Sequence, residues 1–378
     1  MKFKFFLAFG VICNLIINTN SVDAGFVFPV VFTYLVNVFK VFLIFLFLYK
    51  TPTLRKIPRH FKYFICFEFF IFFYGLIFNS EYYQLKNTFL YFLPQIICLP
   101  IAFIYYNKIS INIKFITRFS VIILFLCSIA GIPGLALQKT FGYLFILGII
   151  HFLRSEHKYL ILILLSYLLL VSFGLESRVT FIRLAIIILI IISYFFLKFK
   201  IFRKYSKKIM VLSAFVLLSF LVNLYLSTGK IVLTEIQTEG FNLTSDTRSL
   251  VYYNVISSTE STSEILLGRG ASAKYKSHFY NAGGSVDQYR YRSEVDILNK
   301  YLYGGVFYVF MFFLAVFYKK DVKRKIREKE IIAVFLVLFT LMSFVENTSE
   351  YSTLWLLFWF LVLNYKYDRL HSINTHTQ

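Results

Sequence analysis

Arginines and carboxylates at the polar edges of an otherwise apolar chain are the residues with the clearest capacity for chemistry. Arg178 closes the tripeptide Glu176–Arg178, and Arg183 lies just over one helical turn further along. Arg248 falls at the expected start of a helix, where its charge opposes the helix dipole. A guanidinium presents a planar fork of donors that binds two phosphate oxygens at once. These arginines therefore favour a phosphate-binding site, although an interfacial pair between Arg178 and Glu176 explains the first of them equally well.

Two carboxylates lie in Ser293–Asp296, directly before an apolar run that begins near residue 300. A carboxylate near a membrane surface can take a proton from a hydroxyl, so Glu294 and Asp296 are candidate catalytic bases. The same residues also suit a helix start, with Ser293 as N-cap and an acid on the positive end of the dipole. His278 is a further catalytic candidate, because it is the only histidine of the long polar stretch over residues 227–299. Capping and catalysis both remain open.

The sequence offers little for metal, nucleotide or redox chemistry. Its cysteines all lie in apolar runs and show no ligand spacing with histidine, which favours simple packing. Gly268-Arg269-Gly270 is an isolated GxG without the following glycine or the strand–helix setting of a phosphate loop. We therefore expect no cofactor and no metal.

The composition is that of a membrane protein. The 378 residues are 58% hydrophobic and 21% aromatic, with a mean hydropathy of +0.70. About twelve apolar runs can be drawn, several near the ~20 residues that cross a bilayer. They lie at about residues 5–18, 26–49, 63–79, 88–106, 119–137, 141–153, 159–175, 181–197, 209–226, 300–318, 331–345 and 352–365. The predicted fold class is all-α, a polytopic transmembrane helical bundle of about 12 spans with one large periplasmic loop.

The charge of +21 is a topology signal and does not indicate nucleic-acid binding. If successive runs cross the membrane in opposite directions, the strongly basic linkers all lie on the same side of it. These are Lys50–Lys62, Lys108–Arg118, Lys198–Lys208 and Lys319–Lys329. The positive-inside rule then predicts a multi-pass membrane protein with both termini cytoplasmic and the long polar stretch outside. The first apolar run also fits a cleavable secretory signal.

Three regions follow from this threading. Residues 1–226 are expected to form the first nine spans, residues 227–299 the large periplasmic loop, and residues 300–378 the last three spans and a cytoplasmic tail. Within the loop we predict a helix over residues 246–256 and a bend at Leu266–Gly268. Lys40 and Glu68 are charges inside spans, which favours a structural ion pair between adjacent helices.

Taken together, these motifs resemble one membrane family. They are Ser177-Arg178 at a helix mouth, Arg248 early in the loop, Leu266–Gly270 midway, Ser293–Leu298 at its end and then Tyr303–Gly305. Their order and sidedness are similar to those of the O-antigen polymerase (Wzy-type) branch of the O-antigen ligase and polymerase superfamily. Ligases of the superfamily usually carry a His-Asn pair where this chain has Ser293-Glu294, which favours the polymerase.

The resemblance implies a metal-independent membrane glycosyltransferase of lipopolysaccharide or related polysaccharide biosynthesis. It would polymerise undecaprenyl-diphosphate-linked oligosaccharide repeat units at the periplasmic face, in contact with membrane lipid. A chain-length regulator and a flippase would be its protein partners. Arg178, Arg183 and Arg248 would bind the diphosphate. Glu294 or Asp296 would act on the acceptor hydroxyl, while the role of His278 stays open.

Other functions remain alternatives. An O-antigen ligase is the nearest within the superfamily. A transporter or flippase for a lipid-linked oligosaccharide could use Lys40, Glu68 and Arg183 inside a cavity, but no internal repeat supports it. An acyltransferase would need an Asp near His278 in a motif that the sequence does not show.

Overall fold

The computed structural model describes residues 12–13, 30–49, 57–79, 81–105, 118–119, 121–122, 126, 144, 226–229, 231, 247–277, 289–318, 335–337, 339–344 and 352–366. These residues are mostly helical, as expected from the apolar runs. The larger helices are α2 (Val30–Tyr49), α3 (Arg59–Phe78), α5 (Leu93–Tyr105), α13 (Asp296–Phe317) and α15 (Ser352–Lys366). A short α4 (Tyr82–Asn87) and a π-helical turn η2 (Thr88–Phe92) lead directly into α5.

Within the described residues, three helical stretches are long and apolar enough to cross a membrane. They are Arg59–Phe78, Tyr82–Tyr105 and Asp296–Phe317. Each begins earlier than the predicted run because the helix continues through polar residues that the hydropathy pattern left out. Gln84 shows the reason: it is buried, and its side-chain amide donates to the carbonyl of Ser272.

Aromatic side chains fill the core between these helices. Phe64 of α3 and Phe312 of α13 both lie against Trp359 of α15, with ring centroids 5.6 Å and 6.3 Å away. Phe339 and Trp355 extend the same cluster. Large rings give much buried area for few rotatable bonds, so the high aromatic content of the sequence serves the interior as well as the outer face.

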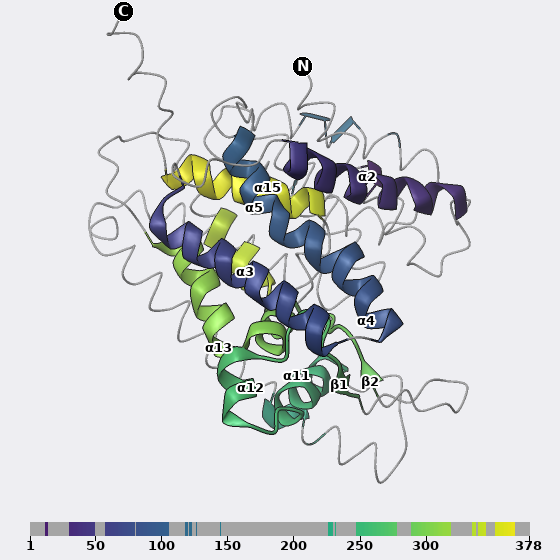
Figure 1. Ribbon diagram of the computed structural model, residues 1–378, viewed down its shortest axis with the longest axis vertical. Helices are drawn as coiled ribbons and strands as arrows, with labels where there is room; N and C mark the ends of the chain where they lie inside the picture. The colour runs from purple at the N-terminus through teal and green to yellow at the C-terminus, as the bar shows by residue number, and fades with distance from the viewer. Residues whose placement is uncertain are drawn as a thin grey trace, which may run out of the picture.

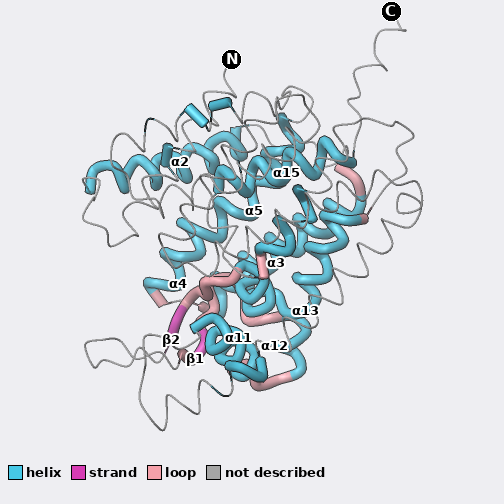
Figure 2. Tube along the Cα trace, turned by 180° about the vertical axis from the view of Figure 1, so that it is seen from behind, coloured by secondary structure: helices cyan, strands magenta, loops and turns pink. Residues whose placement is uncertain are grey.

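We call residues 227–299 the polar segment. Its described helices and strands lie together at one end of the larger helices (Figures 1 and 2). It contains α11 (Thr247–Ser257), α12 (Thr262–Leu267) and the antiparallel strands β1 (Tyr275–Lys276) and β2 (Tyr289–Arg290). The predicted helix over residues 246–256 is confirmed to within one residue at each end. The predicted bend at Leu266–Gly268 is wrong for its first two residues, which end the helix α12, and the chain turns at Gly268, where φ is 69°. The small strand pair is an addition to the all-α expectation.

The helix α13 is broken near its middle. Gly304 has φ −136° and ψ 16°, and Gly305 has φ 63° and ψ −165°, a combination that a residue with a side chain rarely adopts. The break leaves the carbonyls of Leu302 and Tyr303 without their usual helical donors. Such groups are costly inside a membrane, by several kcal/mol each.

The polar segment supplies the missing donors. The amides of Arg269 and Gly270 donate to the carbonyls of Leu302 and Tyr303, both at 2.9 Å, and the amide of Ala271 donates to Ile71 of α3 at 3.1 Å. We call Gly268–Ala271 the docking strip. Asn79 completes the contact, since its side-chain amide donates to the carbonyls of Arg269 and Ala271, each at 3.0 Å. The polar segment is therefore bound backbone to backbone to α3 and α13.

Candidate functional site

The predicted site residues fall into two groups. Glu294 and Asp296 are described, and Arg248 is the second residue of α11 (Thr247–Ser257). Arg178, Arg183 and His278 lie outside the described residues. The geometry around the two candidate bases, Glu294 and Asp296, can therefore be described, whereas that of the complete set of predicted arginines cannot.

Asp296 is fully buried and holds an ion pair. Its Oδ2 accepts from Lys300 Nζ at 2.7 Å, and both side chains are about 1% exposed or less. The ammonium also lies 4.7 Å from the Trp355 ring and 4.8 Å from Phe312. A straight helix would separate Lys300 from Phe312 by roughly 18 Å, so their contact depends on the break in α13, while Trp355 comes from α15.

The start of α13 also differs from the predicted cap. The helix begins at Asp296, so Asp296 is its first residue and Val295 stands at the N-cap position. The hydroxyl of Ser293 instead accepts a hydrogen bond from the amide of Val295 at 3.1 Å. The Asn299 side chain accepts from the Ser293 amide and donates to the Ser293 carbonyl. Polar residues thus fix the entry to α13, but by a different pairing than the sequence pattern indicated.

We predict that Lys300→Met lowers the free energy of unfolding by about 3–5 kcal/mol, because it removes the buried ammonium that forms an ion pair with the Asp296 carboxylate. Thermal unfolding of the purified protein measures this. Adding Asp296→Asn to the variant should restore part of the loss, whereas Lys276→Met, at the exposed position of strand β1, should have little effect. Equal melting temperatures for Lys300→Met and the wild type would contradict the structural role.

Glu294, by contrast, is open to solvent. Its side chain is 61% exposed and lies 4.0 Å from the guanidinium of Arg290. Arg290 pairs across the strands with Tyr275, whose phenol has a pKa raised to about 12 by burial. Tyr275 therefore stays protonated at neutral pH and neutral beside the charged pair. Of the two predicted bases, only Glu294 has an oxygen that an incoming hydroxyl can reach without rearrangement.

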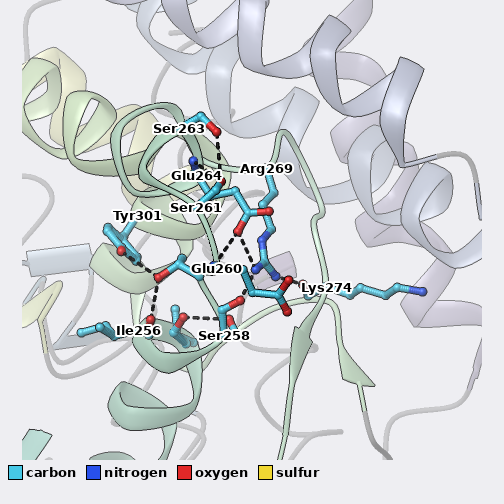
Figure 3. A network of polar contacts seen from close by, with 11 residues as sticks. Ile256, Ser258, Glu260, Ser261, Ser263, Glu264, Arg269, Lys274 and Tyr301 are labelled. Carbon is cyan, nitrogen blue, oxygen red and sulfur yellow. Dashed lines mark hydrogen bonds and ion pairs between the residues drawn. The ribbon is translucent and has the colours of Figure 1, made fainter.

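Arg269, in the docking strip, organises the polar segment itself (Figure 3). Its guanidinium donates to the carbonyl of Ser258 and, at 2.7 Å, to the carboxylate of Glu264. Glu264 also receives the amide of Glu260, and its own amide donates to Ser261, the N-cap of α12. Burial works to raise the pKa of Glu264, but the bonds from Arg269 and Glu260 hold it below its ordinary value. This network is structural.

A second set of polar contacts ties the polar segment to the loop before α4. Lys274 Nζ donates to Glu81 at 2.5 Å, and the Tyr291 hydroxyl donates to the other Glu81 oxygen at 3.2 Å. The hydrogen bond from Lys274 lowers the pKa of Glu81, and the same bond raises that of Lys274. Both groups thus remain charged over the neutral range. Because they are exposed, they orient the loop more than they stabilise it.

Comparisons with models of protein families, with curated proteins and with solved structures gave no match to this chain. The chemistry of the site therefore has to be argued from its own residues.

The expected ion pair between Lys40 and Glu68 is wrong. Glu68 accepts instead from the hydroxyl of Tyr308 at 2.9 Å, and Lys40 lies over the ring of Tyr91 at 4.0 Å. The ring of Phe47 on α2 stacks on the ring of Phe69, the residue after Glu68. Phe47, and not Lys40, is therefore the α2 residue that lies beside this part of α3. Along α2, Lys40 is roughly 10 Å away from Phe47. This distance is too large for the Lys40 side chain to pair with Glu68.

Sequence reasoning missed two cations that the structure places in the interior or at its edge. Lys300 was hidden inside an apolar run, although an acid four residues before a lysine is a recognisable helical pair. Arg292 carries no signal in the sequence beyond its place before an apolar run, yet its guanidinium lies 4.6 Å from the Tyr91 ring. Among the described residues, no group of three or more His, Cys, Asp or Glu side chains could hold a metal ion.

Proposed function

We propose that this chain is a membrane glycosyltransferase that polymerises oligosaccharide repeat units carried on a polyprenyl diphosphate, at the external face of the bacterial inner membrane. One observation carries the proposal. Glu294 is a solvent-exposed carboxylate just before the start of α13, directly after Ser293, whose backbone amide and carbonyl are both bonded by Asn299.

The reaction needs few groups. The acceptor hydroxyl attacks the anomeric carbon of the donor sugar, and the bond between that carbon and the diphosphate oxygen breaks. The leaving diphosphate keeps the electron pair, and Glu294 takes the hydroxyl proton. Arg178, Arg183 and Arg248 would stabilise the charge on the diphosphate. Because the leaving group is already activated, no nucleotide is consumed.

The finer architecture belongs to the same proposal. About twelve spans, an external loop over residues 227–299 and cytoplasmic termini would put Glu294 on the side where a lipid-linked donor presents its sugars. The buried pair of Asp296 with Lys300 favours Glu294 as the base, with Asp296 supporting the start of α13.

A transporter or flippase is the second candidate, favoured by one observation. Broken helices such as α13 often bind ions or substrates at their freed backbone groups. Here the freed carbonyls of Leu302 and Tyr303 already accept from Arg269 and Gly270. The break thus serves to hold the polar segment, which supports an enzyme with a fixed external site over a transporter with a vacant one.

Topology tests the premise of this proposal. Alkaline phosphatase fused near Asn242 or Asn281 should be active, since the enzyme folds only outside the cytoplasm, and fusions near Lys204 or Lys325 should be inactive. An inactive fusion at Asn281, produced at the same level as the others, would remove the basis for an external active site.

A further inference from the structure

We infer that α12 and the docking strip, which together cover Thr262–Ala271, form a re-entrant segment that enters the membrane and contacts lipid acyl chains. Ile265, Leu266 and Leu267, the last turn of α12, make this contact, and we call them the apolar turn. They are 40%, 52% and 49% exposed. The inference goes beyond the proposed function, because it requires only that α3 and α13, which are long and apolar enough, cross a membrane.

The polarity of α12 changes along its axis. Its first residues, Thr262 and Ser263, are polar and exposed, and they follow the exposed N-cap Ser261. The apolar turn carries no polar side chain. A helix that lies flat on a membrane divides its polar and apolar residues between two faces. A helix that divides them along its length, as α12 does, is suited to enter the membrane with its C-terminal end first.

Two neighbouring helices give the depth of the docking strip. One of its amides donates to the carbonyl of Tyr303, which is roughly 10 Å along α13 from the start of that helix at Asp296. Another donates to the carbonyl of Ile71, which is roughly 10 Å along α3 from the end of that helix at Phe78. The strip therefore lies well inside both candidate spans and not at their ends.

The apolar turn lies at the same level. A Cβ added at Gly305, in the break of α13, would come within 2.3 Å of the backbone of Leu266. Directly after the break, α13 exposes Val306, Phe307 and Phe310. On a helix that crosses a membrane, exposed side chains of this kind face lipid. The apolar turn thus continues the lipid-facing surface of α13, which identifies lipid as its partner.

The backbone of the docking strip meets the requirement that hydrocarbon imposes. Irregular backbone at membrane depth is tolerated only where it is buried in protein and its polar groups are bonded. All four amides of Gly268–Ala271 donate to carbonyls of the protein. Three of the four carbonyls accept, two from the side chain of Asn79 and one from the amide of Ala273. A loop in water does not need such extensive bonding, because water supplies the partners.

Both ends of the segment lead back to polar, exposed residues. Glu260 and Ser261, before α12, are exposed. After the strip, Lys274 forms its exposed ion pair with Glu81, which directly precedes the candidate span that begins at Tyr82. The chain therefore descends through α12, turns in the docking strip and returns to the same surface.

The charge of Arg269 is compatible with this depth. Its guanidinium donates to the carboxylate of Glu264 at 2.7 Å and to the carbonyls of Ser258 and Lys274 (Figure 3). A charge at membrane depth is tolerated when it is paired, or when its stem extends to the surface. Both conditions hold here, since Glu264 is the counter-charge and Lys274 lies at the exposed end of the segment.

Fluorescence quenching by brominated lipid tests the contact. Each variant is reconstituted in liposomes of phosphatidylcholine brominated in the upper part of its acyl chains, and the emission of the buried Trp355 and Trp359 in the wild type is subtracted. Leu267→Trp places the reporter on the apolar turn, and Phe310→Trp places it on the lipid-facing surface of α13. The matched control Ser263→Trp places it on the first turn of α12. We expect bromine to quench the added emission of Leu267→Trp as strongly as that of Phe310→Trp. The added emission of Ser263→Trp should instead be quenched by iodide, present on both sides of the membrane.

Leu266→Trp is a second reporter on the apolar turn, and it carries the test if Leu267→Trp does not fold. Quenching of these reporters by iodide and not by bromine would overturn the inference and place α12 in water. Protection from both quenchers would also overturn it, because a protein surface, such as a second copy of this chain, would then cover the turn. Either result leaves the proposed function standing, since the proton transfer assigned to Glu294 does not depend on the depth of α12.

Discussion

Gly268→Ala and Gly305→Ala should each lower the free energy of unfolding by several kcal/mol. A Cβ at Gly268 would overlap the backbone of Tyr303 and Gly304, and one at Gly305 would overlap the backbone of Leu266. Both glycines have positive φ, 69° and 63°, where a side chain adds about 1–3 kcal/mol of strain. Overpacking adds about 1–3 kcal/mol more. Thermal unfolding and the yield of folded protein measure the combined effect.

Gly304→Ala is the matched control for this experiment. It makes the same change at the next position, but φ at Gly304 is negative and the nearest atoms belong to the side chains of Ile71 and Tyr308. The Cδ1 of Ile71 is a side-chain end that can shift, whereas the Cβ of the buried Tyr308 can shift only with its helix. We expect a smaller loss than at Gly268 and Gly305, because the strain from a positive φ is absent. If all three variants unfold alike, the contact between the docking strip and α13 does not hold the polar segment in place.

Glu294→Gln should lower the rate of polymerisation by about 10²- to 10⁴-fold, the usual contribution of a general base. The amide keeps the size of the side chain but cannot take the proton. Folding should be nearly unchanged, since the 4.0 Å contact with Arg290 is exposed and such pairs contribute at most about 1 kcal/mol. The rate is measured on purified protein with lipid-linked repeat units.

The control for this variant is Glu260→Gln, an exposed acid of the same polar segment whose backbone, and not its carboxylate, enters the Arg269 network. It should polymerise at the wild-type rate. A folded Glu294→Gln protein that also polymerises at that rate would show that another group, or none, takes the proton.

Local pattern was enough to predict the longer helices and α11, but not the short helices α4 and α12. Long apolar runs located α3, α5, α13 and α15, and polar spacing located α11 within one residue at each end. The errors at the helix starts came from polar residues such as Gln84, which the hydropathy pattern excluded but which find partners in the bundle. Composition alone does not show such partners.

Contacts between distant segments were beyond sequence reasoning. Leu266–Gly270 and Tyr303–Gly305 were both recognised as motifs, yet nothing in either indicated that one fills the break in the other. The predicted pairing of Lys40 with Glu68 is wrong for a related reason. The position of each charge across the membrane was inferred from its own helix, without knowing which residues of the two helices lie side by side. Which helices are level with each other depends on side chains such as Phe47 and Phe69.

The most direct test of the account is polymer formation by the purified wild-type protein in liposomes that contain lipid-linked repeat units. The reaction is run without nucleotide and with a chelator, and its products are separated by length on a gel. We predict a ladder of glycans that differ by one repeat unit, formed at the same rate with and without the chelator. Intact, unextended repeat units in the presence of folded protein, or a ladder that requires added metal, would contradict the account.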